Sequence, residues 1–235
     1  GPGPFKIENN YLEAAGENVM FGGADAAIFG LVPSDIEIVR NHFHKPLKWK
    51  TDDPSFEGSE WAVKNLFELK NARRVLVARN LFENNWRHAQ NGFAILFTPR
   101  NQDGRSPWSV VEDVTFRDNV VRRVGAGFNI LGRDDAQESG ETRRILIYNN
   151  LLSEVGGTWG GNGRLFQLLN GVEGVSIVNN TAEVVTENAD KSVFLAVAAA
   201  NADFLQNAPG DLFGPFAVDG ADPVYRFRTV RYAPP

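Results

Sequence analysis

Acidic and basic side chains gather in two stretches of this sequence. The first stretch contains Lys64, Glu68 and Lys70, and the second contains Arg100, Asp103, Arg133, Asp134 and Asp135. A cation can neutralise an anionic group on a ligand, and a nearby base can then remove a proton from the adjacent carbon. We therefore interpret six of these residues as candidates for acid–base chemistry on an acidic ligand, and Lys70 and Asp103 as candidates for binding that ligand.

Two reactions and one structural role compete for these residues. Elimination from a uronate needs a cation or metal beside the carboxylate and a base for the neighbouring proton. Hydrolysis of a glycoside needs two carboxylates at a defined separation, one of them protonated. Asp134 and Asp135 are adjacent, so on a strand they would point to opposite faces and form a poor pair. In the structural alternative, Arg100, Arg133, Asp134 and Asp135 are an ion-pair cluster at the bases of loops.

Three of the five tryptophans are candidates for contact with a sugar. Trp86, Trp108 and Trp159 lie in or beside polar loops. An exposed indole combines an apolar face with a polar N–H and can stack on a sugar ring. The competing interpretation is that these side chains pack loops onto the core, as tryptophan more often does.

A six-fold repeat organises the elements that must position these side chains. Each repeat contains an asparagine with an apolar residue five before, three before and two after it. These asparagines are Asn10, Asn41, Asn80, Asn119, Asn150 and Asn180, at spacings of 31, 39, 39, 31 and 30 residues. The two leading apolar positions predict a short strand with one buried face. The asparagine fits a sharp turn because it tolerates the left-handed region, and its amide can bond to its counterparts along a stack.

Further strands are predicted after the turns, at residues 63–69, 93–98, 128–133, 165–169 and 193–198. The period is longer than that of a leucine-rich repeat, and no stretch between the repeats has a convincing helical period. We therefore predict an all-β fold, a right-handed parallel β-helix of about six to seven coils with an asparagine ladder. Successive coils would stack about 4.8 Å apart. Aligning Phe67, Leu96 and Leu131 predicts that Arg100 and Asp135 are neighbours, in a groove walled by loops near residues 47–60 and 101–109.

Stacking of the repeats also predicts columns of side chains. Three residues after each asparagine the column reads Glu13, His44, Glu83, Arg122, Ser153 and Glu183. Alternating charge of this kind is typical of a solvated surface ladder. The alternative is a divalent-metal site formed by Glu13, His44 and Glu83.

The repeats resemble the parallel β-helix repeat family, the pectate-lyase-like superfamily, over approximately residues 5–205. Residues 16–25, 61–70 and 91–100 are similar to bacterial "right-handed β-helix region" proteins. The resemblance implies an extracellular or cell-surface location and a polysaccharide partner. It also implies that lysine and arginine could act together with acidic ligands of calcium. We accordingly expect a lyase-like enzyme acting on an acidic polysaccharide. The alternatives are a non-catalytic glycan- or protein-binding module of a bacterial surface protein and a glycoside hydrolase.

The composition narrows the classes of partner. The chain has 235 residues, no cysteine and a formal charge of −5, which argues against a nucleic-acid partner and excludes disulfides. Apolar runs are too short to span a membrane. We predict an irregular start at residues 1–4, a β-helix over 5–201 and a C-terminal cap or irregular tail over 202–235. Because the sequence begins inside a repeat, we also expect a missing N-terminal part of the protein, or another chain, to cover the first coil.

Overall fold

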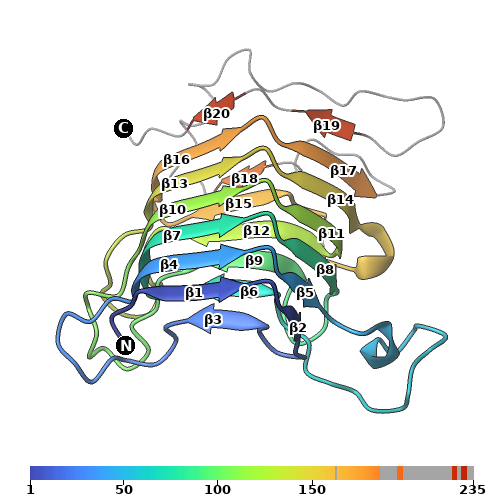
Figure 1. The fold of residues 1–235 in the computed structure, drawn as a ribbon, viewed down its shortest axis with the longest axis horizontal. Helices are drawn as coiled ribbons and strands as arrows, with labels where there is room; N and C mark the ends of the chain where they lie inside the picture. Colours follow the sequence, from blue (N-terminus) through green and yellow to red (C-terminus); the bar gives the residue numbers. More distant parts are fainter. Residues whose placement is uncertain (162, 186–194, 198–223, 227–228, 232–235) are drawn as a thin grey trace.

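The computed structural model is a stack of short parallel strands in three sheets (Figure 1). It describes residues 1–161, 163–185, 195–197, 224–226 and 229–231. Among these residues there is no helix that is long and apolar enough to cross a membrane. The predicted tail at 202–235 lies outside the described residues except for 224–226 and 229–231, and the predicted strand at 193–198 is described only at 195–197.

Each sheet takes one strand from every repeat. Sheet A contains β1 (Phe5–Glu8), β4 (Ser34–Val39), β7 (Ala72–Ala78), β10 (Val111–Arg117), β13 (Arg143–Tyr148), β16 (Glu173–Val178) and β20 (Thr229–Arg231). Sheet B contains β2 (Tyr11–Glu13), β5 (His42–His44), β8 (Leu81–Asn85), β11 (Val120–Val124), β14 (Leu151–Gly156), β17 (Thr181–Val185) and β19 (Val224–Arg226). Sheet C contains β3 (Val19–Phe21), β6 (Phe67–Leu69), β9 (Phe93–Phe97), β12 (Ala126–Leu131), β15 (Phe166–Leu169) and β18 (Leu195–Val197). The chain therefore passes through A, B and C in turn and forms a parallel β-solenoid.

Two further features complete the architecture. Strands β20 and β19 pair antiparallel to β16 and β17 at the end of the stack. The short 3-10 helices η1 (Leu47–Trp49) and η2 (Gly157–Trp159) lie in connections that follow sheet B strands. In Figure 1 the loop with η1 projects from the side of the solenoid.

The interior is a continuous apolar core. Strand β4 alternates buried and exposed residues, which directs Ile36 and Ile38 inward. Phenylalanines from successive coils stack within the core: the ring centroids of Phe43 and Phe82 lie 4.4 Å apart, and those of Phe82 and Phe116 lie 5.5 Å apart. Burial of these rings supplies much of the energy that holds neighbouring coils together.

The six repeat asparagines form a hydrogen-bonded row at the corner between sheets A and B. The Asn41 Nδ2 donates to Asn80 Oδ1 at 3.1 Å, and the Asn80 Nδ2 donates to Asn119 Oδ1 at 3.0 Å. The same bond joins Asn10 to Asn41, Asn119 to Asn150, and Asn150 to Asn180. Each of the first five asparagines also donates its backbone N–H to the next side chain. The row thus satisfies polar groups that the corner buries.

The prediction that these asparagines occupy the left-handed region is wrong. The residue immediately before each one has positive φ instead: Asn9, Arg40, Arg79, Asp118, Asn149 and Asn179. The preceding residue, which is exposed in five of the six coils and partly buried at Asp118, makes the turn. The asparagine side chain is then left to point along the stack, where it bonds to the next coil.

The predicted register of sheet C is also wrong. Phe67 pairs with Ile95, and Ile95 pairs with Phe128, rather than Phe67 with Leu96 and Leu131. Every residue of β9 is apolar and buried, so its sequence gives no alternation from which to choose a face. Strand β6 is shorter than predicted and begins at Phe67.

Candidate functional site

Lys70 and Glu68 form an ion pair at the end of strand β6. Lys70 Nζ lies 2.7 Å from Glu68 Oε1, and the Glu68 side chain is only 1% exposed. Asn65 Nδ2 and Thr98 Oγ1 also donate to this carboxylate, at 3.1 and 3.3 Å. The Lys70 side chain remains 20% exposed. The buried carboxylate therefore fixes a cation that solvent can still reach.

Arg100 has a similar arrangement one coil further along the stack. Its Nη1 donates to Asp134 Oδ1 at 2.8 Å and to Asp135 Oδ1 at 3.3 Å. The predicted contact between Arg100 and Asp135 is therefore present, although Asp134 is the nearer partner. The Asp134 side chain is fully buried, whereas that of Asp135 is 63% exposed.

Backbone donors hold Asp134 in its charged form. The backbone N–H groups of Asn101 and Ala136 donate to its two carboxylate oxygens at 2.7 and 3.0 Å. Burial acts to raise the pKa of Asp134, but these two bonds and the Arg100 guanidinium outweigh burial and lower it. A carboxyl group held in this way cannot serve as a protonated acid near neutral pH.

Lys70 and Arg100 lie on adjacent coils. The backbone N–H of Arg100 donates to the carbonyl oxygen of Lys70 at 3.0 Å. The two residues therefore lie side by side, just after the C-terminal ends of the neighbouring strands β6 and β9. We call Lys70 and Arg100, with their anchors Glu68 and Asp134, the paired-cation site. It presents two partly exposed cations on rigid supports.

Three other predicted groove residues pair with partners outside the paired-cation site. Lys64 pairs with Glu17 at 3.1 Å, before strand β6 begins. Asp103 pairs with Arg105 at 2.8 Å on an exposed loop. The side chain of Arg133 contacts Glu141, and both line a separate hollow of 440 Å³. The predicted groove therefore does not gather all eight charged residues.

The tryptophan predictions have different outcomes. Trp86 is only 5% exposed, so its indole packs in the protein and is not available to stack on a sugar. The Nε1 of Trp108 donates to the Leu31 carbonyl at 3.2 Å, and its ring lies 4.9 Å from that of Phe29. Trp159 ends η2 and is partly buried.

Two tryptophans outside the prediction are better placed for a ligand. Trp61 is 49% exposed and its ring centroid lies 5.8 Å from that of Trp49, in the long connection after β5. The polar composition of residues 47–60 was the signal that could have identified this pair.

The column of Glu13, His44 and Glu83 is present, but its side chains do not converge on one point. Strand pairing aligns Glu13 with His44 and His44 with Glu83. The Glu83 carboxylate binds His42 Nε2 at 2.8 Å and Arg122 Nε at 2.8 Å, and it also contacts Arg123. Across the described ranges, no group of three or more His, Asp or Glu residues could hold a metal ion. The structure thus does not assemble the predicted metal site.

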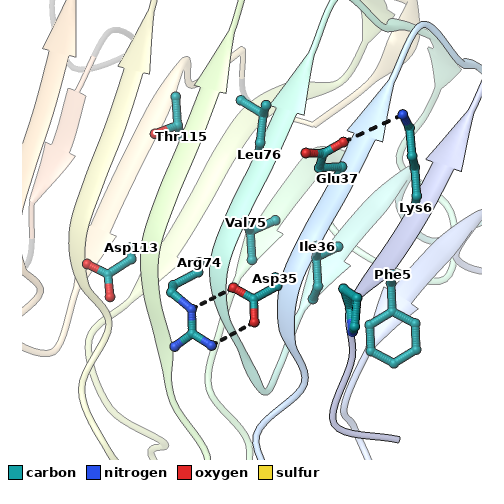
Figure 2. A pocket seen from close by; sticks show the side chains of 11 residues that line it. Phe5, Lys6, Asp35, Ile36, Glu37, Arg74, Val75, Leu76, Asp113 and Thr115 are labelled. Atoms are coloured by element: carbon teal, nitrogen blue, oxygen red, sulfur yellow. Dashed lines mark hydrogen bonds and ion pairs between the residues drawn. The ribbon is translucent and has the colours of Figure 1, made fainter.

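Sequence reasoning missed a second row of alternating charge on sheet A. Six residues before each later asparagine the row reads Asp35, Arg74, Asp113, Arg144 and Gly174. Arg74 Nε and Nη2 donate to the two oxygens of Asp35 at 2.7 and 2.8 Å. Both residues line an open groove of 660 Å³. Figure 2 shows the pair, with Asp113 further along the row. The same alignment on the asparagines would have revealed the row.

No protein-family model, no curated protein and no solved structure matches this chain. The function must therefore be argued from the side chains that the solenoid positions.

Proposed function

We propose that this protein is a carbohydrate-active β-helix that acts on an acidic polysaccharide, with Lys70 and Arg100 receiving a uronate carboxylate. The observation that carries the proposal is the pair of partly exposed cations on adjacent coils, each held by a buried carboxylate. Cations fixed in this way lose little side-chain entropy when they bind an anion. We further infer a right-handed helix of about six to seven coils of the pectate-lyase-like type, supported by three strands per repeat and the bonded asparagines.

Elimination is the reaction that this site supports better than hydrolysis. Neutralisation of the substrate carboxylate by Arg100 would make the proton on the adjacent carbon more acidic. Asp135 is exposed and lies 3.3 Å from Arg100, so it is the candidate base. Hydrolysis would need one carboxyl group to stay protonated, and the lowered pKa of Asp134 opposes that role.

A non-catalytic glycan-binding module is the second candidate. Glu68 is committed to three donors and Asp134 to Arg100 and two backbone N–H groups. Buried acids that only hold two cations in place are sufficient for a site that binds an anionic glycan without reacting with it. Under this alternative, Asp135 would contribute nothing to turnover.

The test combines binding and activity on polygalacturonate, alginate and a neutral glucan. Product absorbance reports elimination, and reducing ends without absorbance report hydrolysis. We expect Lys70→Gln and Arg100→Gln each to weaken binding of the acidic polymers about tenfold, the loss of one charge-assisted contact. Asp135→Asn should abolish absorbance and leave binding within about twofold.

The matched control is Lys6→Gln, which removes an exposed lysine that is paired with Glu8 on sheet A. If Lys6→Gln weakens binding as much as Lys70→Gln does, binding depends on the net charge of the protein and not on the paired-cation site. That result would contradict the proposal. Binding of acidic polymers without any product identifies the non-catalytic module.

A further inference from the structure

A third hollow lies beside the sheet B strands β5, β8 and β11. It has a volume of 480 Å³ and is lined by His44, Glu83, Asn84 and Arg123 from the strands and by Lys48 and Glu57 from the loop that contains η1. This is a loop that the sequence predicts as a groove wall. The loop borders an open hollow next to β5 and β8, and neither Lys70 nor Arg100 lines that hollow.

Two arginines bind one buried acid beside this hollow, although only Arg123 of the two lines it. Glu83 is buried and binds both Arg122 and Arg123, whose side chains remain 39% and 30% exposed. Two guanidinium groups on one carboxylate leave one positive charge in excess. In addition, the buried Nε of Arg123 has no hydrogen-bond partner. Lys48 and Glu57 pair with each other at 3.2 Å on the opposite wall and cancel.

His44 adds a neutral polar surface to the same hollow. Asn84 Nδ2 lies 3.0 Å from His44 Nε2, and Tyr11 Oη lies 2.8 Å from His44 Nδ1. Because an amide nitrogen only donates, His44 Nε2 accepts and Nδ1 carries the hydrogen. The imidazole is therefore held in one tautomer, between the Glu13 carboxylate and Arg123.

We propose that this hollow is a second, separate binding site for the anionic group of a sugar, a carboxylate or a sulfate, received by Arg123 against the wall formed by Lys48. It is independent of Lys70 and Arg100, because those residues lie at the far ends of the sheet C strands. A polymer with regularly spaced anionic groups could occupy both sites, and its avidity would exceed the affinity of either site.

The experiment uses the whole chain and follows the His44 ring signals by NMR during titration. The probes are galacturonate oligomers, dextran sulfate oligomers and neutral dextran. We expect the acidic probes to shift the His44 signals and neutral dextran to leave them unchanged. Comparison of the two acidic probes tells whether carboxylate or sulfate binds more tightly. Arg123→Gln should weaken the interaction about tenfold, whereas Arg123→Lys should retain most of it.

Arg122→Gln is the matched control, because Arg122 shares Glu83 but does not line the hollow. Equal losses in Arg122→Gln and Arg123→Gln would show that the freed Glu83 charge causes the effect and would overturn the proposal. A His44 response to neutral dextran would also overturn it. The Lys70→Gln/Arg100→Gln double variant should keep the His44 response, so failure of the paired-cation site leaves this site intact.

Discussion

Two parallel rows of side chains on the same solenoid follow opposite rules. The asparagine row repeats one residue type in all six coils, and five of its six members are buried. Only three residues further along the chain, the row beginning Glu13, His44 and Glu83 changes residue type at nearly every coil. The first row meets the same backbone corner each time, so one chemistry serves throughout. The second row lies on the outer side of sheet B, where each side chain needs only to suit its neighbours, as Glu83 does where Arg122 and Arg123 cover it.

This contrast suggests where stability and ligand binding reside. Uniform buried rows should control unfolding, and variable outward rows should control interactions and their dependence on pH. Three measurements test this division, beginning with the largest expected effect.

Lys45 is buried although it does not belong to a uniform row, and it lies four residues after Asn41. It is therefore the strongest exception to the division between uniform buried rows and variable outward rows. Its Nζ donates to the carbonyl oxygens of Ala14, Ala15 and Gly16 at 2.8, 2.9 and 2.6 Å and to Asn18 Oδ1 at 2.9 Å. Lys45→Met would leave these oxygens without their donor, and each such loss costs about 1–3 kcal/mol. We expect the free energy of unfolding to fall by about 3 kcal/mol or more, measured by urea denaturation.

The control for Lys45 is Lys48→Met, an exposed lysine in the adjacent loop. It should change the free energy of unfolding by less than about 1 kcal/mol. Similar losses in the two variants would mean that the carbonyl contacts do not stabilise the fold.

Asn80 tests the uniform row. Its Nδ2 donates to Asn119 Oδ1 and to the carbonyl oxygens of Ile38 and Ala78, and its Oδ1 accepts from Asn41. Asn80→Ala should lower the free energy of unfolding by about 1–3 kcal/mol, because buried donors and acceptors on both sides lose their partner. Asn149→Gly is the control, since Asn149 is exposed and has positive φ, which glycine accepts. An unchanged urea midpoint in Asn80→Ala would show that the row contributes no stability.

The sequence predicts the repeating parts of this molecule better than the singular ones. Each repeat asparagine has apolar residues five before, three before and two after it. These positions predict the strands of sheets A and B, because every coil buries the same positions. The register of sheet C was missed because the apolar strand β9 carries no alternation. The predicted contact between Arg100 and Asp135 is present although the alignment that predicted it is wrong, and the divergence of Arg133 toward Glu141 was not predicted. Such choices depend on loop conformation, which no repeat constrains.

The smallest expected effect comes from His44 of the variable row and from its neighbour His42. The two imidazoles lie near Tyr11, Glu13, Glu83, Arg122 and Arg123. Burial lowers the pKa of both imidazoles, and further lowering comes from Arg122 and Arg123 for His42 and from His42 for His44. The unfolded chain therefore takes up protons more readily as the pH falls below about 6.5, so stability should decrease from pH 7 to pH 5. The His42→Gln/His44→Gln double variant should lose this decrease, which we expect to stay below about 1 kcal/mol at such partly exposed positions. Urea midpoints of the parent and the double variant across this range are the measurement. Parallel curves would place the pH dependence outside the variable row and contradict the division.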